Sequence, residues 1–325
     1  MVTRLLNRLR IDPYVLSLLG TVLLASLLPA RGIWASIAGL AADAGIVLLF
    51  FLHGARLSTD AVLAGARNLR LHGAVAVMTF VVFPALGLAI AALPGIDPSL
   101  AQGMLFLTLL PSTIQSSVAF TAMAGGNVAA ALCSASLSNL AGMAITPVLV
   151  GLLMTGRSGG FSGDAVLVIA GQLLLPFLAG HGVRRWIGGW ITRRKAVLTY
   201  VDRGSILLVV YTAVGAAVVD GLWDKLPLDQ LATMLALCAA LLAAVLALSS
   251  AMARWLRLDR ADSIVLQFCG SKKSLASGVP IAGALFAPAA AGAIVIPLIL
   301  FHQIQLMVCA VLARRYARQS AASAA

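Results

Sequence analysis

Long apolar segments take up almost all of this 325-residue chain. They recur ten times, and most are about 17–25 residues long, the length that crosses the hydrocarbon core of a bilayer as a helix. Because backbone groups in lipid must bond within their own segment, we expect helices. The predicted spans are Tyr14–Pro29, Ile33–Leu52, Leu71–Leu93, Leu100–Ala124, Val128–Met154, Ala165–Val183, Tyr200–Val219, Leu231–Trp255, Ser263–Phe286 and Ala289–Ala313.

The composition agrees with a polytopic membrane protein. Hydrophobic residues make up 61% of the chain and charged residues 10%, whereas soluble domains carry about 25% charged residues. The net charge of +12 does not indicate nucleic-acid binding, because the basic residues lie in short clusters between apolar segments. We therefore expect membrane lipid around the chain, with no nucleic acid as a partner.

The basic residues also predict an orientation. With the N-terminus inside, eighteen Lys and Arg residues fall in inner segments, and only Arg31, Arg157 and Lys225 fall in outer ones. Cytoplasmic loops carry an excess of Lys and Arg. We therefore predict a multi-pass protein of the bacterial cytoplasmic (inner) membrane with both termini cytoplasmic. The two remaining basic residues, Lys272 and Lys273, lie inside the ninth span.

Small polar residues interrupt two spans, the fourth of five in the first half and the ninth of ten. The interruptions are LPSTIQSSVAFTAMAGGN at Leu110–Asn127 and FCGSKKSLASG at Phe268–Gly278. An odd number of spans in each half makes the second half insert upside down. Paired broken helices in inverted halves are typical of a transporter site near mid-membrane, although either motif alone is also typical of a Ser-rich packing surface. We predict that Pro111–Ser117 and Gly270–Ser274 are non-helical and approach each other.

These features resemble the bile acid:sodium symporter (solute carrier 10) family. The two broken spans, GGNVAAAL after the fourth span and FHQ in the tenth carry the resemblance, which covers nearly the whole chain. FFLHGARLS, TFVVFPALGL and FCGSKKSLASGVP are similar to its orphan, SBF-like branch, which includes bacterial proteins and the seventh vertebrate member.

The resemblance implies a fold. It is an all-α polytopic membrane protein whose ten transmembrane helices form two inverted five-helix repeats. The repeats, residues 11–156 and 162–316, lie in a single transmembrane domain, 1–325. Spans 1, 2, 6 and 7 form a panel domain, and spans 3–5 and 8–10 form a core domain in which discontinuous helices 4 and 9 cross.

The resemblance also implies a cation site from which acidic ligands have been lost. In sodium-coupled members, the ninth-helix break carries a Glu and, four residues on, a Gln that help bind sodium. These positions fall on Phe268 and Lys272, a third-helix Gln position falls on Thr79, and this chain contains no Glu. The proposed cation site, or its replacement, consists of Lys272, Ser116, Ser117, Thr79, Ser134, Ser138 and Ser271.

The two lysines are the main functional candidates, because an intramembrane charge is costly and marks a functional site by default. Lys272 would place its ammonium where sodium sits in relatives, or would carry a proton. Lys273, about 100° further round a helix, would face the substrate. Alternatively, both lysines bond unwound carbonyls of the crossing. Asp43 is a candidate counter-ion or a polar contact within the panel.

The expected function is secondary transport of a small organic anion by alternating access, with altered or absent sodium coupling. The alternative is a non-transporting membrane regulator of ion (calcium) homeostasis. We expect no enzyme, cofactor or bound metal; the coupling ion is either a proton or sodium, and the protein is a monomer or homodimer. The predicted substrate-binding residues are Lys273, His302, Gln303, Gln115 and Ser274.

Overall fold

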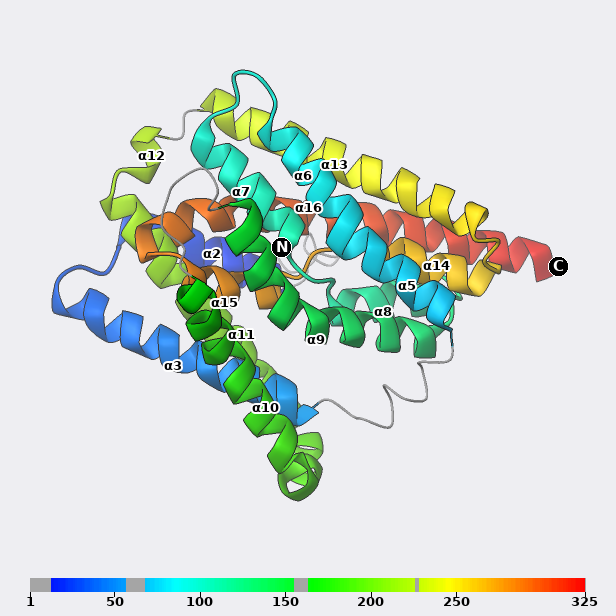
Figure 1. The fold of residues 1–325 in the computed structure, drawn as a ribbon, viewed down its shortest axis with the longest axis horizontal. Helices are drawn as coiled ribbons and strands as arrows, with labels where there is room; N and C mark the ends of the chain where they lie inside the picture. Colours follow the sequence, from blue (N-terminus) through cyan, green and yellow to red (C-terminus); the bar gives the residue numbers. More distant parts are fainter. Residues whose placement is uncertain (1–12, 57–67, 155–162, 226–227, 325) are drawn as a thin grey trace, which may run out of the picture.

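The computed structural model describes residues 13–56, 68–154, 163–225 and 228–324, and all regular structure in these ranges is helical (Figure 1). Every predicted span falls on one helix or on consecutive helices. The elements are α2 (Pro13–Leu27), α3 (Ile33–Arg56), α5 (Leu69–Val77), the π-turn η1 (Met78–Val82), α6 (Phe83–Ala91), α7 (Pro98–Leu109), α8 (Ile114–Met123), α9 (Val128–Leu153), α10 (Gly163–Arg193), α11 (Lys195–Val219), α12 (Leu222–Lys225), α13 (Leu228–Trp255), α14 (Arg260–Gly270), α15 (Leu275–Leu285) and α16 (Pro288–Ala324).

Within the described ranges, six helices are long and apolar enough to cross a membrane, and the bent pair α7–α8 makes a seventh candidate. Large apolar side chains on the outer faces are exposed, including Leu27, Trp34 and Leu152. Exposed apolar surface on this scale marks contact with a partner or with lipid. The chain is therefore built as a multi-pass membrane protein, while its division into ten spans and two inverted halves stays a prediction.

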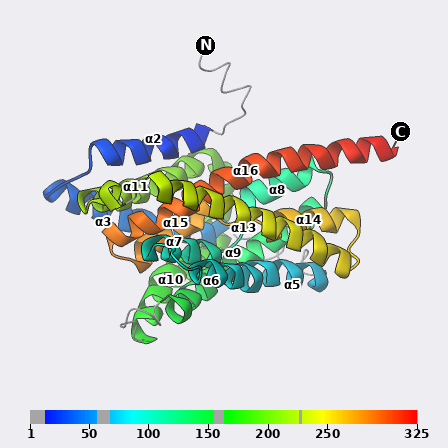
Figure 2. The same ribbon diagram turned by 90° about the horizontal axis from the view of Figure 1, so that it is seen from above.

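Helices α2, α3, α10 and α11 lie together on one side of the molecule. Helix α3 packs against α10 and α11, and α2 packs against α11. Figures 1 and 2 both show α2 and α3 toward the opposite end of the molecule from α5 and α14. These four helices correspond to the spans that the resemblance assigns to the panel.

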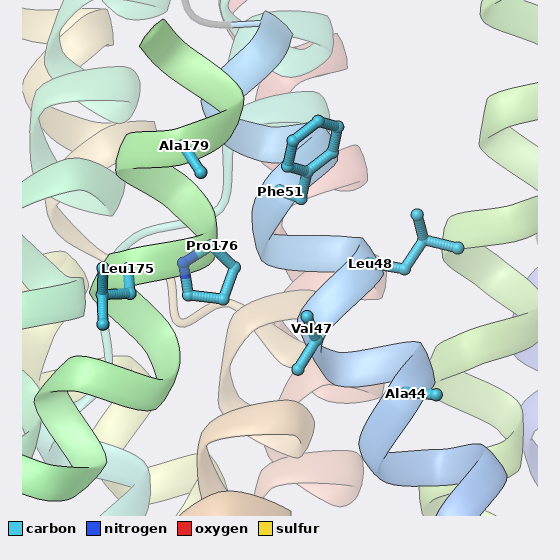
Figure 3. A pocket seen from close by; sticks show the side chains of 7 residues that line it. All are labelled: Ala44, Val47, Leu48, Phe51, Leu175, Pro176 and Ala179. Carbon is cyan, nitrogen blue, oxygen red and sulfur yellow. The ribbon is translucent and has the colours of Figure 1, made fainter. Parts of the chain in front are cut away.

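A close backbone contact joins α3 to α10. A Cβ atom added at Gly54 would lie 1.9 Å from the carbonyl oxygen of Phe177, and one added at Gly180 would lie 2.0 Å from that of Phe51. The two helices run in the same direction here, and a shallow groove opens between them (Figure 3). The groove is lined by Ala44, Val47, Leu48, Phe51, Leu175, Pro176 and Ala179. Because this lining offers no polar side chain to a solute, the candidate site lies elsewhere.

Three helix N-termini meet at the carboxylate of Asp262. Asn68 caps α5 and donates a side-chain hydrogen bond to Asp262, and Asn127 caps α9 and donates another at 3.1 Å. Asp262 itself lies in the first turn of α14, whose N-cap is Asp259. Since helix N-termini carry partial positive charge, one buried carboxylate there stabilises all three. This contact fixes the ends of α5, α9 and α14 relative to one another.

We predict that Gly180→Ala destabilises the protein while Gly182→Ala does not. The first methyl group would meet the α3 backbone, and relieving such overpacking costs about 1–3 kcal/mol. Nothing lies within 4 Å of a Cβ at Gly182, and Ala is the better helix former. Thermal unfolding of the detergent-solubilised variants measures the difference. Equal unfolding midpoints would contradict the α3–α10 contact.

Candidate functional site at the crossing of two broken helices

The two breaks predicted from the sequence meet in the structure. Helix α7 ends at Leu109 and α8 begins at Ile114, with a bend of 64° between them. Helix α14 ends at Gly270 and α15 begins at Leu275. The N–H of Ser274 donates to the carbonyl of Pro111 at 2.9 Å, so the breaks are in direct contact. The breaks are shorter than predicted, because residues 114–117 already belong to α8 and Gly270 belongs to α14.

Local chemistry explains why the helices stop here. Pro111 has no N–H, and a residue before proline disfavours helical backbone, so Leu110 is extended, with φ −76° and ψ 155°. In the other break, Ser274 caps α15 by accepting a hydrogen bond from the N–H of Ser277 at 3.1 Å. Ser is among the residues preferred at an N-cap, where the backbone is not helical, and Ser274 is extended, with φ −84° and ψ 111°.

Neutral side chains satisfy the carbonyl end of α14. Ser112 donates its hydroxyl to the carbonyl of Cys269 at 2.6 Å, and Ser117 donates to that of Phe268 at 3.0 Å. Both donors come from the other broken segment, α7–α8. The second break in turn donates the N–H of Ser274 to the carbonyl of Pro111, so each break supplies hydrogen-bond donors to the other. Because a buried unpaired carbonyl is costly, these bonds hold the crossing together.

Helix α9 supplies the remaining neutral partners. The side chains of Asn139 and Thr146 donate to the carbonyls of Ser112 and Leu109 at 3.0 and 2.9 Å. The hydroxyl of Ser138 accepts the N–H of Ser112 at 3.0 Å. The first break is therefore bonded along its length to one face of α9.

The ammonium of Lys273 satisfies the carbonyl end of α7. Its Nζ donates to the carbonyls of Thr79, Thr108 and Leu110 at 2.9, 2.8 and 2.6 Å, and the side chain is fully buried. Distances near 2.8 Å are those of charge-assisted hydrogen bonds. The ring centroid of Phe83 lies 4.1 Å from the same nitrogen. We call these three carbonyl groups the carbonyl cage.

Lys272 has different surroundings. Its Nζ has no hydrogen-bond partner among the described residues, and it lies 3.9 Å from the ring centroid of Phe120 and 5.5 Å from that of Phe268. No carboxylate of the described chain lies within 4.0 Å of either ammonium, and Asp43 is exposed on α3. Asp43 is therefore not the counter-ion that the sequence suggested. The caged ammonium belongs to Lys273, whereas the sequence hypothesis assigned the cation position to Lys272.

Gln305 holds the backbone of Lys273 from α16. Its side-chain oxygen accepts the N–H of Lys273 at 3.0 Å, and its nitrogen donates to the carbonyl of Lys273 at 3.0 Å. The same nitrogen lies 2.8 Å from Nδ1 of His302. The predicted residue His302 therefore reaches the crossing through Gln305. Gln305 was not among the residues predicted from the sequence, which included Gln303 instead.

The other predicted residues are dispersed around the crossing. Ser271 donates to the carbonyl of Gln267 in its own helix, and Ser134 pairs with Nδ1 of His72 at 2.7 Å. Gln115 is exposed. Among these other predicted residues, the hydroxyls of Thr79 and Ser116 and the side-chain nitrogen of Gln303 are buried without a hydrogen-bond partner in the described chain.

Several residues at the crossing were not singled out from the sequence. The sequence could have marked Asn139 and Gln305, because each is a polar amide side chain within a long apolar segment. Ser112 also lay inside a motif that had been recognised. No local pattern marked Phe83 and Phe120, whose rings matter only because distant segments bring the lysines to them.

Comparison with known proteins now decides the family. The pattern of the SBF-like CPA transporter family matches residues 12–318. The chain belongs to this family. It is thus a member of a transporter family, in agreement with the resemblance to bile acid:sodium symporters.

Individual relatives cover most of the chain. A Pseudomonas aeruginosa protein named "Uncharacterized protein PA2026" is 54% identical over 95% of this chain and 93% of its own length. The Escherichia coli (strain K12) protein named "Putative symporter YfeH" is 51% identical over 95% and 94%. Sodium/bile acid cotransporter 7 of Mus musculus is 26% identical over 82% and 80%.

We predict that Ser117→Ala destabilises the crossing and that Ser116→Ala does so much less. Removing the Ser117 hydroxyl leaves the buried Phe268 carbonyl without its donor, at a cost of about 1–3 kcal/mol. The Ser116 hydroxyl has no hydrogen-bond partner among the described residues, so Ser116→Ala is the matched control. Thermal unfolding in detergent compares the two. A larger loss in Ser116→Ala would show that the bond from Ser117 is unimportant.

Proposed function

We propose that the protein is a secondary active transporter that moves a small organic anion by alternating access, without sodium coupling. The observation that carries the proposal is the contact between two broken helices with two buried lysines beside it. A crossing of unwound segments is the arrangement in which membrane transporters bind solutes. Membership of a transporter family supports the same reading.

The charges at the crossing favour an anionic substrate. Lys272 and Lys273 bring positive charge, and neither has a carboxylate within 4.0 Å among the described residues. The N-termini of α8 and α15 begin at the breaks, and helix N-termini carry partial positive charge. Within the proposal, Lys273, Ser274, Gln115, His302 and Gln303 remain the substrate-binding candidates. The candidates for the cation site or its replacement remain Lys272, Ser116, Ser117, Thr79, Ser134, Ser138 and Ser271.

Alternating access would come from relative motion of two helix groups. The proposed panel is α2, α3, α10 and α11, which pack against one another. The proposed core contains the broken helices, whose crossing is held by buried hydrogen bonds. Rocking of one group against the other would open the crossing alternately to each side, as in other transporters built from repeats.

Absent sodium coupling follows from the ammonium in the carbonyl cage. The Nζ atom of Lys273 occupies a point less than 3 Å from three carbonyl oxygens. A sodium ion 4 Å from that charge would be repelled by about 4 kcal/mol at an effective dielectric near 20. That is roughly a thousandfold in affinity, which would prevent coupling at ordinary sodium concentrations.

We predict sodium-independent uptake. Proteoliposomes containing the protein should accumulate at least one member of a panel of small organic anions faster than protein-free liposomes. The rate should not change when external sodium is replaced by choline, and Lys273→Gln should lower it by at least tenfold. A separately imposed proton gradient distinguishes proton coupling from uniport. Acceleration of wild-type uptake by a sodium gradient would refute the absence of coupling.

We also predict that both termini are cytoplasmic. In a cysteine-free background, Arg31→Cys should react with a membrane-impermeant maleimide in intact cells. Arg194→Cys should react only after the membrane is permeabilised. Both residues are exposed, so accessibility depends on the side of the membrane. The opposite labelling pattern would overturn the proposed orientation.

A further inference from the structure

The carbonyl of Thr79 is free to bind a cation because of the sequence that follows it. Thr79 lies in the π-turn η1, where the N–H of Phe83 donates to the carbonyl of Met78. In that pattern the N–H of residue 84 would serve Thr79, but residue 84 is Pro and has no N–H. The Thr79 carbonyl thus lacks a helical donor, and Lys273 supplies one.

The other two carbonyls of the cage are free for a different reason. Thr108 lies in the last turn of α7, and Leu110 is its C-cap. The last carbonyls of a helix have no intrahelical donor, and they carry the partial negative charge of the helix dipole. The three oxygens therefore come from two segments, lack helical donors of their own and converge on the Lys273 nitrogen.

We propose that the carbonyl cage is a monovalent-cation site built by the backbone, which Lys273 keeps permanently filled with its own ammonium. The site would take a cation of the ammonium or alkali-metal class once that side chain is removed. Carbonyl groups that converge on a cation replace its hydration shell in selective channels. The inference rests on the proposed function only in placing the cage at the transport site. Its test measures the stability of the protein and not uptake, so the two proposals can fail independently.

The size of the missing group defines the probe. Lys273→Ala removes three carbons and the ammonium, so n-propylammonium is the fragment that refills the space. At neutral pH it is protonated, as a lysine side chain is in water. The neutral n-propanol has nearly the same shape but brings no charge. Tetramethylammonium has the charge but no N–H to donate, and it is wider.

Thermal unfolding of the purified full-length Lys273→Ala variant tests the proposal. The unfolding midpoint should be lower than that of the wild type. n-Propylammonium should raise it saturably, by about 3 °C or more, because a ligand that binds only the folded state stabilises it. n-Propanol and tetramethylammonium should raise it much less, and ammonium or sodium should have an intermediate effect. The wild-type midpoint should not respond.

Lys272→Ala is the matched control. It deletes the same atoms from a fully buried position, but no hydrogen-bond acceptor faces the Lys272 nitrogen in the described chain. n-Propylammonium should therefore bind at least tenfold more tightly than n-propanol in Lys273→Ala. In Lys272→Ala the ratio of these two affinities should be much smaller. Equal ratios in the two variants, or no cation response in Lys273→Ala, would overturn the proposal.

A double-mutant cycle keeps the proposal falsifiable if Lys273→Ala does not fold. Pro84→Ala gives residue 84 an N–H that competes for the Thr79 carbonyl. With Lys273 present, this change should lower the unfolding midpoint. In a Lys273→Met background it should be neutral or stabilising, because Ala is the better helix former. The same shift in both backgrounds would show that Pro84 does not build a cation site, and would overturn the proposal.

Discussion

The structure depends on the need to satisfy the backbone of two broken helices in an environment without water. A carbonyl or N–H left unpaired in hydrocarbon costs several kcal/mol. Each break therefore requires a donor or acceptor for almost every residue. The side chains that meet this need come from α7–α8, α14–α15, α9 and α16, so the crossing joins segments far apart in the sequence.

Helix α9 acts as the support for the first break. Its Ser138, Asn139 and Thr146 bond to the unwound segment, and Gly142 lets Pro111 approach closely. A Cβ at Gly142 would lie 2.5 Å from the Cβ of Pro111. Small residues let backbones come together in membranes, where polar side chains then bond across helices. The polar residues of the fifth span are thus explained by the break opposite them.

The sequence could predict the helices and the breaks for a simple reason. Hydropathy and the run Pro111-Ser112-Thr113 act locally, so the segments they mark coincide with helices and with an interruption. Roles at the crossing depend on distant contacts. The 100° rotation used to separate Lys272 from Lys273 applies to a helix, and both residues lie in the non-helical break. Their directions are set by the carbonyl cage, by two aromatic rings and by Gln305, which no local pattern reveals.

The two breaks occupy matching positions in the sequence but are electrostatically unlike. Neutral hydroxyl groups complete the carbonyl end of α14, whereas an ammonium completes that of α7. The dipole of α7 is therefore neutralised by a covalently attached charge, and such a charge cannot leave with the substrate or exchange with ions in solution. A crossing held in this way needs no bound ion to stay intact. Lys272 is buried and has no acceptor in the described chain. It is the charged group at the crossing that the backbone does not hold.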